Sequence, residues 1–204
     1  NRMLDPELRE DAANMLAPRR AAFRKPDFIA GTAKITGAEL GTALHKVMRH
    51  IPMREYASAV ELRREIDSIC ERGLMAENEC EAVDESRVMS FLGSPLGRRA
   101  ILADELFREF RFSLLVPAEE FFRGGGDDEI LFQGVVDLAF REGGTLTVVD
   151  FKTDRIYSDA SLCEKIDIYT PQIKSYMQAL GRVTGLSAGE GHIYFFDGSK
   201  AVRV

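Results

Sequence analysis

The sequence predicts a single α/β domain, in which helices and strands contribute to one core. Residues 130–140 and 145–151 are typical of two strands, and the segment 141–144 (REGG) supplies the turn of a hairpin between them. Amphipathic helical patterns precede this hairpin, and a helix and two short strands follow it. With 204 residues, 45% of them hydrophobic and 29% charged, the chain is long enough for one core.

The first 30 residues read as a linker or lead-in segment, and we expect the domain itself from residue 31 to residue 204. The lead-in carries a basic cluster between Arg19 and Lys25. This cluster could contact nucleic acid, but a charge run is more often a solvated linker. Because the chain begins with Asn1, we expect a domain excised from a longer polypeptide, and processing would look the same.

A helix is expected over residues 37–51, with Thr36 as its cap, because apolar residues recur there at helical spacing. His45 lies on this helix. A lone histidine is more often a surface or core residue than a ligand. The small residues 41–43 (GTA) allow another element to approach closely, so His45 becomes a ligand candidate if the hairpin faces this helix.

Further helices are expected at 56–73, at 77–92 and from Ser94, where a serine before a proline is typical of a helix start. Residues 108–122 alternate charged and apolar types and then become apolar, which predicts a strand. Glu109 on that strand either adds an acid to a site or decorates an exposed face of the sheet.

Two carboxylates and a lysine are predicted to meet on the hairpin. Asp150 and Lys152 are two apart on one strand and share a face, and the turn returns Asp137 alongside them. Two carboxylates are hard ligands for Mg²⁺ or Mn²⁺, and a lysine can orient water or neutralise charge during phosphodiester hydrolysis. The alternative, a surface salt bridge, is disfavoured by the apolar strand 145–149 that leads into Asp150.

The segment 161–185 contains a helix on which Gln172 and Tyr176, four residues apart, share a face. Both can donate or accept hydrogen bonds near a phosphate or near Lys152, although an amphipathic helix edge would show them equally well. The last two apolar segments, joined by an Asp-Gly turn, are expected to complete the sheet.

Composition limits the classes of function. Three cysteines without C-x-x-C spacing do not support an iron–sulfur cluster or a zinc site. A net charge of −6 argues against a strongly basic nucleic-acid platform, although a domain delivered to DNA by an attached module would not need one. No apolar run approaches the about 18 residues of a membrane span, so we expect no membrane contact and a cytoplasmic location. Residues 124–128 (GGGDD) lack the Lys-Ser or Lys-Thr that follows the glycines of a phosphate loop, so we do not expect this segment to bind a nucleotide.

Five short motifs occur in a particular order: GTALH at 41–45, REFRF at 108–112, QGVVD at 133–137, DFKTD at 150–154 and QIKSY at 172–176. In order and spacing they resemble the RecB-like nuclease domain of the PD-(D/E)xK superfamily, and within it the AddA type of bacterial helicase–nucleases. The resemblance covers residues 31–204. It implies a central mixed sheet flanked by helices, with an N-terminal helical cluster.

The resemblance also implies roles for individual residues. His45, Asp137 and Asp150 would bind Mg²⁺ or Mn²⁺ together with the backbone carbonyl of Phe151, and Lys152 would assist the attacking water. Three more residues would support the catalytic site: Gln172, Tyr176 and the acid Glu109.

The function implied is that of a metal-dependent DNA exonuclease domain of an ATP-dependent helicase–nuclease in double-strand break processing and recombinational repair. ATP would act only through an upstream helicase region absent from this sequence. Single strands produced by unwinding and an AddB-type subunit would be its partners in the bacterial cytoplasm. Related domains with an iron–sulfur cluster carry four cysteines, and the three here favour the AddA type. The alternative is a catalytically idle domain of the same fold that binds DNA or a partner subunit, which would not need intact Asp137, Asp150 and Lys152.

Overall fold

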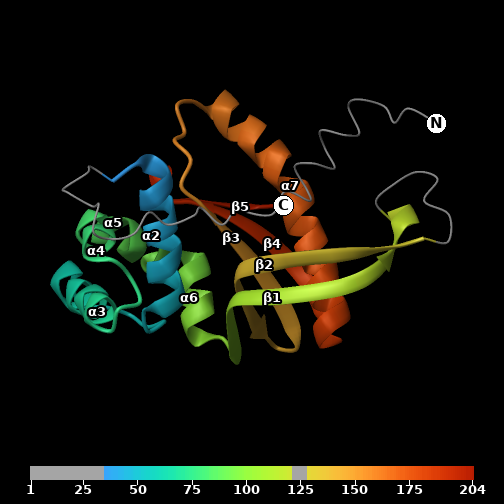
Figure 1. The fold of residues 1–204 in the computed structure, drawn as a ribbon, viewed down its shortest axis with the longest axis horizontal. Helices are drawn as coiled ribbons and strands as arrows, with labels where there is room; N and C mark the ends of the chain where they lie inside the picture. Colours follow the sequence, from blue (N-terminus) through green and yellow to red (C-terminus); the bar gives the residue numbers. More distant parts are fainter. Residues whose placement is uncertain (1–34, 121–127) are drawn as a thin grey trace. The chain divides into compact units, whose positions relative to one another are not determined.

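The computed structural model describes residues 35–120 and 128–204 (Figure 1). Residues from Ile35 onward form one compact unit. The expected lead-in of residues 1–30 and its basic cluster lie outside the described residues, so the domain boundary at residue 31 stays a prediction.

Five strands form one mixed sheet in the order β1–β2–β3–β4–β5. Strands β3 and β4 are parallel, with helix α7 as the crossover between them, and the other neighbouring pairs are antiparallel. The predicted mixed sheet is therefore confirmed. The strands are β1 (Glu105–Pro117), β2 (Glu129–Glu142), β3 (Thr145–Lys152), β4 (Ser187–Phe195) and β5 (Lys200–Arg203).

The central hairpin forms as the sequence predicts. Strands β2 and β3 pair from Glu142 opposite Thr145 to Leu138 opposite Val149. The two residues between the strands, Gly143 and Gly144, have φ values of +54° and +85°, which residues with a Cβ rarely adopt. The turn therefore depends on the glycine pair.

Helix α2 (Gly37–His50) begins at the predicted cap. Thr36 Oγ1 accepts the backbone amide of Glu39 at 3.2 Å, and the Glu39 carboxylate accepts the backbone amide of Thr36 at 2.7 Å. This reciprocal capping box satisfies two of the amides that a helix leaves unpaired at its start.

One helix and one strand before the central hairpin differ from the sequence prediction. The helix expected at 77–92 is two helices, because Asp84 accepts the amide of Ser86 and starts a new helix after Val83. The strand expected at 108–122 runs from Glu105 to Pro117 instead, followed by a short 3₁₀ turn. The helices are α3 (Ala59–Glu71), α4 (Glu77–Ala82), α5 (Glu85–Gly93), α6 (Pro95–Leu102) and α7 (Asp159–Thr184). None of the helices in the described ranges is both long and apolar enough to cross a membrane.

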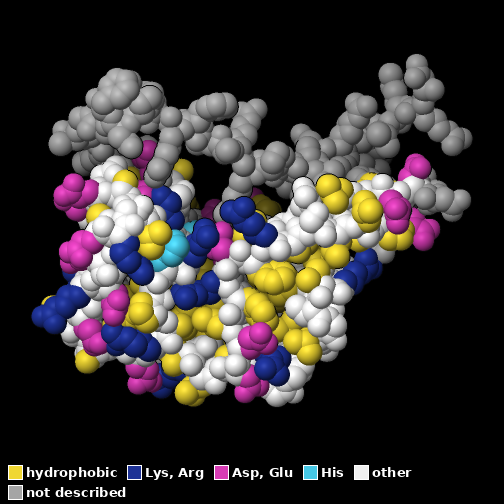
Figure 2. All heavy atoms as spheres, turned by 60° about the horizontal axis from the view of Figure 1, so that its bottom comes forward, with side chains coloured by type: hydrophobic (Ala, Val, Ile, Leu, Met, Phe, Trp, Pro, Cys, Tyr) yellow, Lys and Arg dark blue, Asp and Glu magenta, His cyan; other side chains and the backbone are white. Residues whose placement is uncertain are grey.

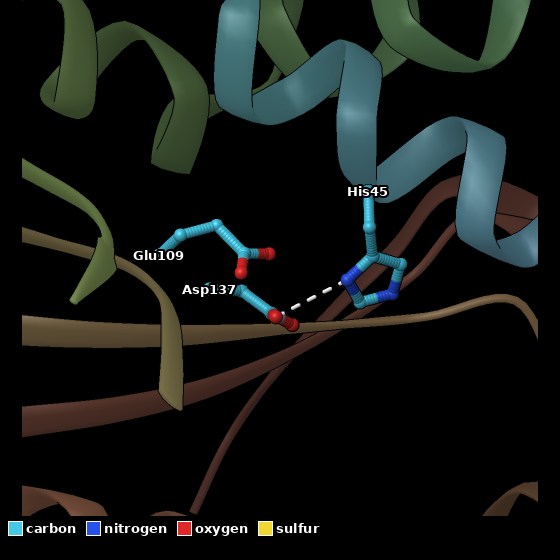
Figure 3. Close-up of side chains that lie close together, drawn as sticks. All are labelled: His45, Glu109 and Asp137. Carbon is cyan, nitrogen blue, oxygen red and sulfur yellow. Dashed lines mark hydrogen bonds and ion pairs between the residues drawn. The ribbon is translucent and has the colours of Figure 1, made fainter. Parts of the chain in front are cut away.

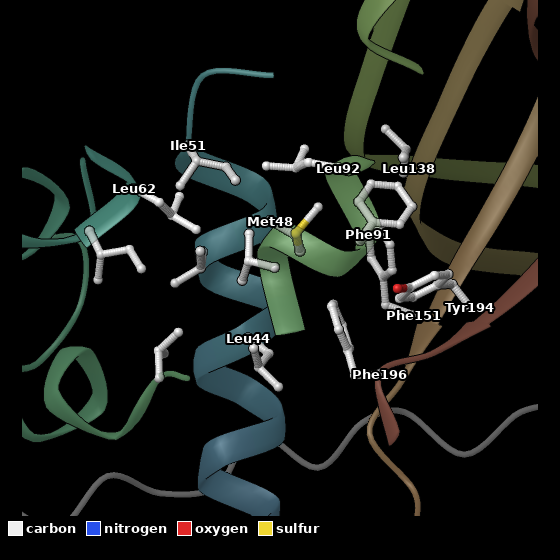
Figure 4. Close-up of a cluster of buried hydrophobic side chains, with 14 of the residues drawn as sticks. Leu44, Met48, Ile51, Leu62, Phe91, Leu92, Leu138, Phe151, Tyr194 and Phe196 are labelled. Carbon is white, nitrogen blue, oxygen red and sulfur yellow. The ribbon is translucent and has the colours of Figure 1, made fainter. Parts of the chain in front are cut away.

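The sheet separates helix α7 from the helices that precede it in the chain (Figure 1). On one face, side chains of α2, α3, α5 and α6 pack with the sheet residues Leu138, Phe151 and Tyr194, and Figure 4 shows Leu44 and Met48 of α2 pointing into this core. On the other face, α7 packs through Ala179 and Leu180 against strand residues such as Val136 and Val148. The hairpin carrying the predicted site is thus enclosed between α2 and α7.

Arg99 fixes α6 to the sheet. Its guanidinium donates to Glu142 Oε2 at 2.7 Å and to Glu190 Oε2 at 2.8 Å. Glu190 Oε2 also lies 3.1 Å from His192 Nε2. This network joins β2 and β4 near the start of β3, at the opposite end of β3 from Asp150 and Lys152.

Candidate active site

Strands β2 and β3 separate at the two predicted acids. Their pairing ends at Leu138 opposite Val149, and Asp137 and Asp150 are the next residues on the two strands. At this point Asp137 Oδ2 accepts the backbone amide of Phe151 at 2.9 Å. A side-chain carboxylate thus takes the place of a strand carbonyl, which fixes Asp137 beside β3 and leaves its other oxygen to face α2.

His45 approaches Asp137 from helix α2 (Figure 3). Its Nδ1 lies 3.1 Å from Asp137 Oδ1, although 92 residues separate the two in the chain. A Cβ at Gly41 would lie 2.7 Å from Thr153 Oγ1, so only glycine allows this close contact between α2 and the end of β3. The hairpin therefore faces the helix, as the ligand interpretation of His45 required.

Glu109 joins this pair from strand β1 (Figure 3). Its neighbours Arg108 and Phe110 pair with Leu138 and Val136, so Glu109 lies opposite Asp137. Ligand atoms of His45, Glu109 and Asp137 all lie within 4.8 Å of one another. Of the two alternatives left open for Glu109, the structure favours an acid at the site.

The backbone at Glu109 has a φ of +50°, which is costly for a residue with a Cβ. In a regular strand, side chains three apart face opposite sides. Phe107 and Phe110 nevertheless pack in the same cluster against α7, as do Val136 and Ala139 on the partner strand. The alternation of side chains between the two faces of the sheet therefore shifts by one residue at Glu109 on β1 and at Asp137 on β2. The two acids lie at this irregularity, so their side chains do not follow the regular alternation.

Asp150 and Lys152 form a second group on the α7 side. Lys152 Nζ lies 2.6 Å from Asp150 Oδ2 and donates to Gln172 Oε1 at 3.0 Å. Gln172 Nε2 in turn donates to the Tyr176 hydroxyl at 2.9 Å. A Cβ at Gly134 would lie 2.9 Å from the Tyr176 ring, so this glycine lets α7 pack closely on β2.

The Asp150 carboxyl is almost fully buried, with 3% of the residue exposed. Burial raises its pKa to about 6, and the negative charge of Asp137 adds to this rise. Lys152 and His45 act in the opposite direction but do not cancel it. Two carboxyls held close together in a buried place need a compensating positive charge to ionise together.

The donor set fits a divalent cation. An imidazole nitrogen and carboxylate oxygens are suitable ligands for Mn²⁺. The carboxylate oxygens are also suitable ligands for Mg²⁺. Asp150 Oδ2 is buried and has no hydrogen-bond partner among the described residues, since its contact with Lys152 is an ion pair outside hydrogen-bond angles. Asp150 is not one of the three residues within 4.8 Å. Its role as a ligand, and that of the Phe151 carbonyl, stay predictions.

The sequence reasoning missed three residues beside Lys152. The Tyr169 ring lies 4.1 Å from Lys152 Nζ, and its hydroxyl donates to Asp154 Oδ2 at 3.0 Å. Lys165 Nζ donates to Asp154 Oδ1 at 2.7 Å. Two signals were present in the sequence: Asp154 closes the motif DFKTD, and Tyr169 precedes Gln172 by three residues, which places both on one helix face.

A fourth missed residue, Arg108, joins β1 to α2. Its Nη1 donates to the backbone carbonyl of Ile51 at 2.5 Å, next to the last residue of α2. A cation at this end of a helix also interacts favourably with the helix dipole. The residue before Glu109 therefore holds the helix that carries His45.

The three cysteines are free and lie on different elements. Cys70 is on α3, the buried Cys80 is on α4 and the exposed Cys163 is on α7. Burial raises the pKa of Cys80 to about 12, so its thiol stays protonated at neutral pH.

Comparisons with known proteins agree with this geometry. The sequence model of the PD-(D/E)XK nuclease superfamily matches residues 17–203. Among curated proteins, an ATP-dependent helicase/nuclease subunit from Clostridium acetobutylicum is 33% identical over 202 residues, which are 96% of this chain and 16% of that protein. The proteins of the same name from Alkaliphilus oremlandii and Listeria welshimeri are 32% and 30% identical, over 89% and 91% of this chain and 15% and 16% of theirs.

The chain thus spans about one sixth of the length of these relatives. A solved structure described as the crystal structure of SSO0001 covers 97% of the chain and 73% of its own at 13% identity with a TM-score of 0.35, a similarity too weak to support a conclusion. The superfamily match includes every motif from His45 to Tyr176. The chain belongs to the PD-(D/E)XK nuclease superfamily.

Proposed function

We propose that this chain is a metal-dependent deoxyribonuclease domain that hydrolyses phosphodiester bonds as an exonuclease. The observation that carries the proposal is the convergence of His45, Glu109 and Asp137 within 4.8 Å, beside the buried pair Asp150–Lys152. These residues come from a helix and three strands. A merely structural ion pair would not require such a convergence.

Each residue has a part in the proposed chemistry. His45, Glu109, Asp137 and Asp150 would hold Mg²⁺ or Mn²⁺. When bound, such a cation polarises a phosphate oxygen and lowers the pKa of a water. The Phe151 amide keeps Asp137 oriented toward the cation site through its hydrogen bond to Oδ2.

Lys152 supplies a positive charge beside the reacting phosphate. Its ammonium can orient the attacking water or stabilise the charge that develops on the phosphoryl oxygens. Gln172 accepts a hydrogen bond from this ammonium, and Tyr176 accepts one from Gln172, so both limit where Nζ can lie.

A local positive region lies near the site despite the net charge of −6. His50, at the end of α2, has its pKa lowered first by burial and then by four nearby cations. The four cations are Arg49, Arg72, Arg108 and Lys46. Figure 2 shows lysine and arginine side chains gathered beside a histidine on one face of the molecule. Such a region favours contact with a phosphate backbone.

The relatives suggest the wider setting. They are named as helicase/nuclease subunits, and this chain corresponds to a small part of each. We therefore infer that it acts within a helicase–nuclease in double-strand break processing, on single strands that an ATP-driven helicase region unwinds. An AddB-type subunit would be its partner, and the bacterial cytoplasm its location.

The competing function is a catalytically idle domain that binds DNA or a partner. Its sequence would be free to lose Lys152, which has no part in forming the core between α2 and the sheet. The presence of Lys152 in an ion pair with the buried Asp150 favours the enzyme.

The test is a nuclease assay of the full-length natural protein. Linear and circular single-stranded DNA, labelled internally, are incubated with Mg²⁺, with Mn²⁺ or with EDTA. The proposal predicts metal-dependent degradation of the linear substrate and survival of the circle. The Asp137→Asn variant is the matched control for a contaminating nuclease. DNA binding without cleavage under any metal condition would support the idle domain instead.

A further inference from the structure

We propose that Tyr169 is a positioning residue for Lys152, and that its ring fixes the lysine ammonium at the reacting phosphate. This inference rests on the proposed nuclease function and adds to it a residue outside the five motifs. Nothing in the motif pattern assigns a role to Tyr169, which lies between DFKTD and QIKSY.

The surroundings of Lys152 Nζ carry the argument. A lysine ammonium has three hydrogens to donate. Gln172 Oε1 accepts one of them at 3.0 Å, Asp150 Oδ2 forms an ion pair with Nζ at 2.6 Å, and the centre of the Tyr169 ring lies 4.1 Å from Nζ. The face of an aromatic ring attracts a cation, more strongly where water is excluded. Only 12% of the Lys152 side chain is exposed, so this condition is met.

The ring also suits a catalytic lysine chemically. A third oxygen acceptor would hold Nζ by a directional hydrogen bond and would compete with a phosphate oxygen for the same proton. A ring face attracts the charge without such a bond, so the ammonium can turn one N–H toward a substrate while its position is kept. Tyr169 would therefore place the charge and leave a donor available.

Tyr169 is itself held in place from outside the site. Its hydroxyl donates to Asp154 Oδ2, and Asp154 is held in turn by Lys165. Burial and the negative charge of Asp154 raise the pKa of Tyr169, so the hydroxyl remains a donor. The ring also contacts Phe195 on β4, with 6.5 Å between ring centres. These contacts fix the ring plane that faces Lys152.

The first experiment separates the ring from the hydroxyl in the full-length natural protein. Single-turnover cleavage is measured for Tyr169→Leu, which removes the ring, and for Tyr169→Phe, which keeps it. A buried cation–ring contact supports a loss of about tenfold in the rate of the chemical step for Tyr169→Leu. KM should stay within about twofold, and Tyr169→Phe should recover most of the rate.

The second experiment asks whether Tyr169 acts through Lys152. In a Lys152→Ala background, Tyr169→Leu should cause no further loss in the residual rate, because the group it positions is already absent. An equal loss in both backgrounds would contradict the inference.

A third readout does not depend on activity. In protein without metal, an amine-reactive acetylating reagent should label Lys152 several-fold faster in Tyr169→Leu than in wild type. The matched control is Tyr56→Leu, because the Tyr56 ring also lies against a cation, with Arg54 Cζ 4.2 Å from the ring centre. Tyr56 belongs to the core on the α2 face of the sheet, away from α7. That variant should leave Lys152 labelling unchanged, and Mn²⁺ affinity should be unchanged in Tyr169→Leu.

The outcomes distinguish the inference from the function on which it rests. Wild-type protein without metal-dependent cleavage would contradict the proposed function, and the inference with it. Normal wild-type cleavage together with an undiminished rate in Tyr169→Leu would contradict the positioning role alone. If Tyr169→Leu fails to fold, Asp154→Ala is used instead, because it removes the carboxylate that accepts the Tyr169 hydroxyl. Wild-type values of both the Lys152 labelling and the cleavage rate in that variant would also contradict the positioning role.

Discussion

Glu109 lies opposite Asp137 across strands β1 and β2, and it does so with a left-handed backbone, at a φ of +50°. The shift in alternation at this point brings the two carboxylates within reach of His45 on α2. A strained residue at such a place is expected where function requires a geometry that local preference opposes.

Replacing Glu109 by glycine should uncouple stability from metal binding. Left-handed backbone costs a non-glycine residue about 1–2 kcal/mol, and the extra freedom of glycine in the unfolded chain offsets about 0.5–1 kcal/mol of that. The free energy of unfolding without metal should thus stay equal or rise by up to about 1.5 kcal/mol. Mn²⁺ affinity measured by calorimetry should fall at least tenfold.

The control is Ser199→Gly, which relieves backbone of the same kind, at a φ of +51°, away from the acids. It should leave Mn²⁺ affinity unchanged. Unaltered Mn²⁺ affinity in Glu109→Gly would remove Glu109 from the metal site.

His45→Ala should weaken Mn²⁺ binding by tenfold or more, because a nitrogen ligand favours Mn²⁺ and its loss is not replaced. His50→Ala, on the same helix but outside the group of ligand atoms, should bind Mn²⁺ as wild type does. Thermal unfolding without metal reports whether either variant disturbs α2. Equal affinities for the two variants would show that His45 is not a ligand.

Gly41→Ala should disturb the site through packing alone. The new Cβ would lie 2.7 Å from Thr153 Oγ1, and overpacking of this kind costs about 1–3 kcal/mol. We expect lower thermal stability and weaker Mn²⁺ binding, since α2 carries His45. Gly37→Ala on the same helix meets nothing within 4 Å and should not be destabilising.

A second substitution tests the cause of that effect. Thr153→Ala removes the contacting oxygen and should restore stability in the Gly41→Ala background. Failure of this rescue would mean that the close approach of α2 to β3 is not what requires a glycine.

The Arg99 network should stabilise the fold in a pH-dependent way. Hydrogen bonds from Arg99, and then from His192, lower the pKa of Glu190 to about 2. A carboxyl with a lowered pKa in the folded state stabilises above its ordinary value of 4.5, and this contribution is lost as the pH falls from 4.5 toward 2.

Glu190→Gln should therefore lower the melting temperature at pH 7, and the difference from wild type should shrink as the pH falls below 4.5. Because a quarter of the Glu190 side chain is exposed, solvent will reduce the size of the effect. Glu129→Gln, at the exposed start of β2, controls for the loss of one negative charge. A difference that stays constant with pH would contradict the assignment.

The sequence predicts the parts of the site that rest on local rules. The Gly143–Gly144 turn sets the register that makes Asp137 and Asp150 the next residues after the paired strands, and Thr36 marks the start of the helix with His45. The close approach of that helix could be anticipated from Gly41, because a small residue on a helix face is a local signal.

Other features depend on tertiary contacts and could not be predicted in this way. The left-handed conformation of Glu109 has no sequence signal, since glutamate seldom adopts it and only the paired strands hold it there. The contact of Tyr169 with Lys152 depends on how α7 lies across β3, which helical periodicity does not specify.

The central claim is that the acids bind a metal while Lys152 acts on the reacting phosphate or water. The measurement that tests it most directly compares Lys152→Ala with Asp137→Ala in the full-length protein, recording Mn²⁺ affinity and the single-turnover rate of single-stranded DNA cleavage for each. We predict that Lys152→Ala keeps its Mn²⁺ affinity within about threefold and loses about 100-fold or more in rate, whereas Asp137→Ala loses both. Cleavage at the wild-type rate by Lys152→Ala would contradict the account.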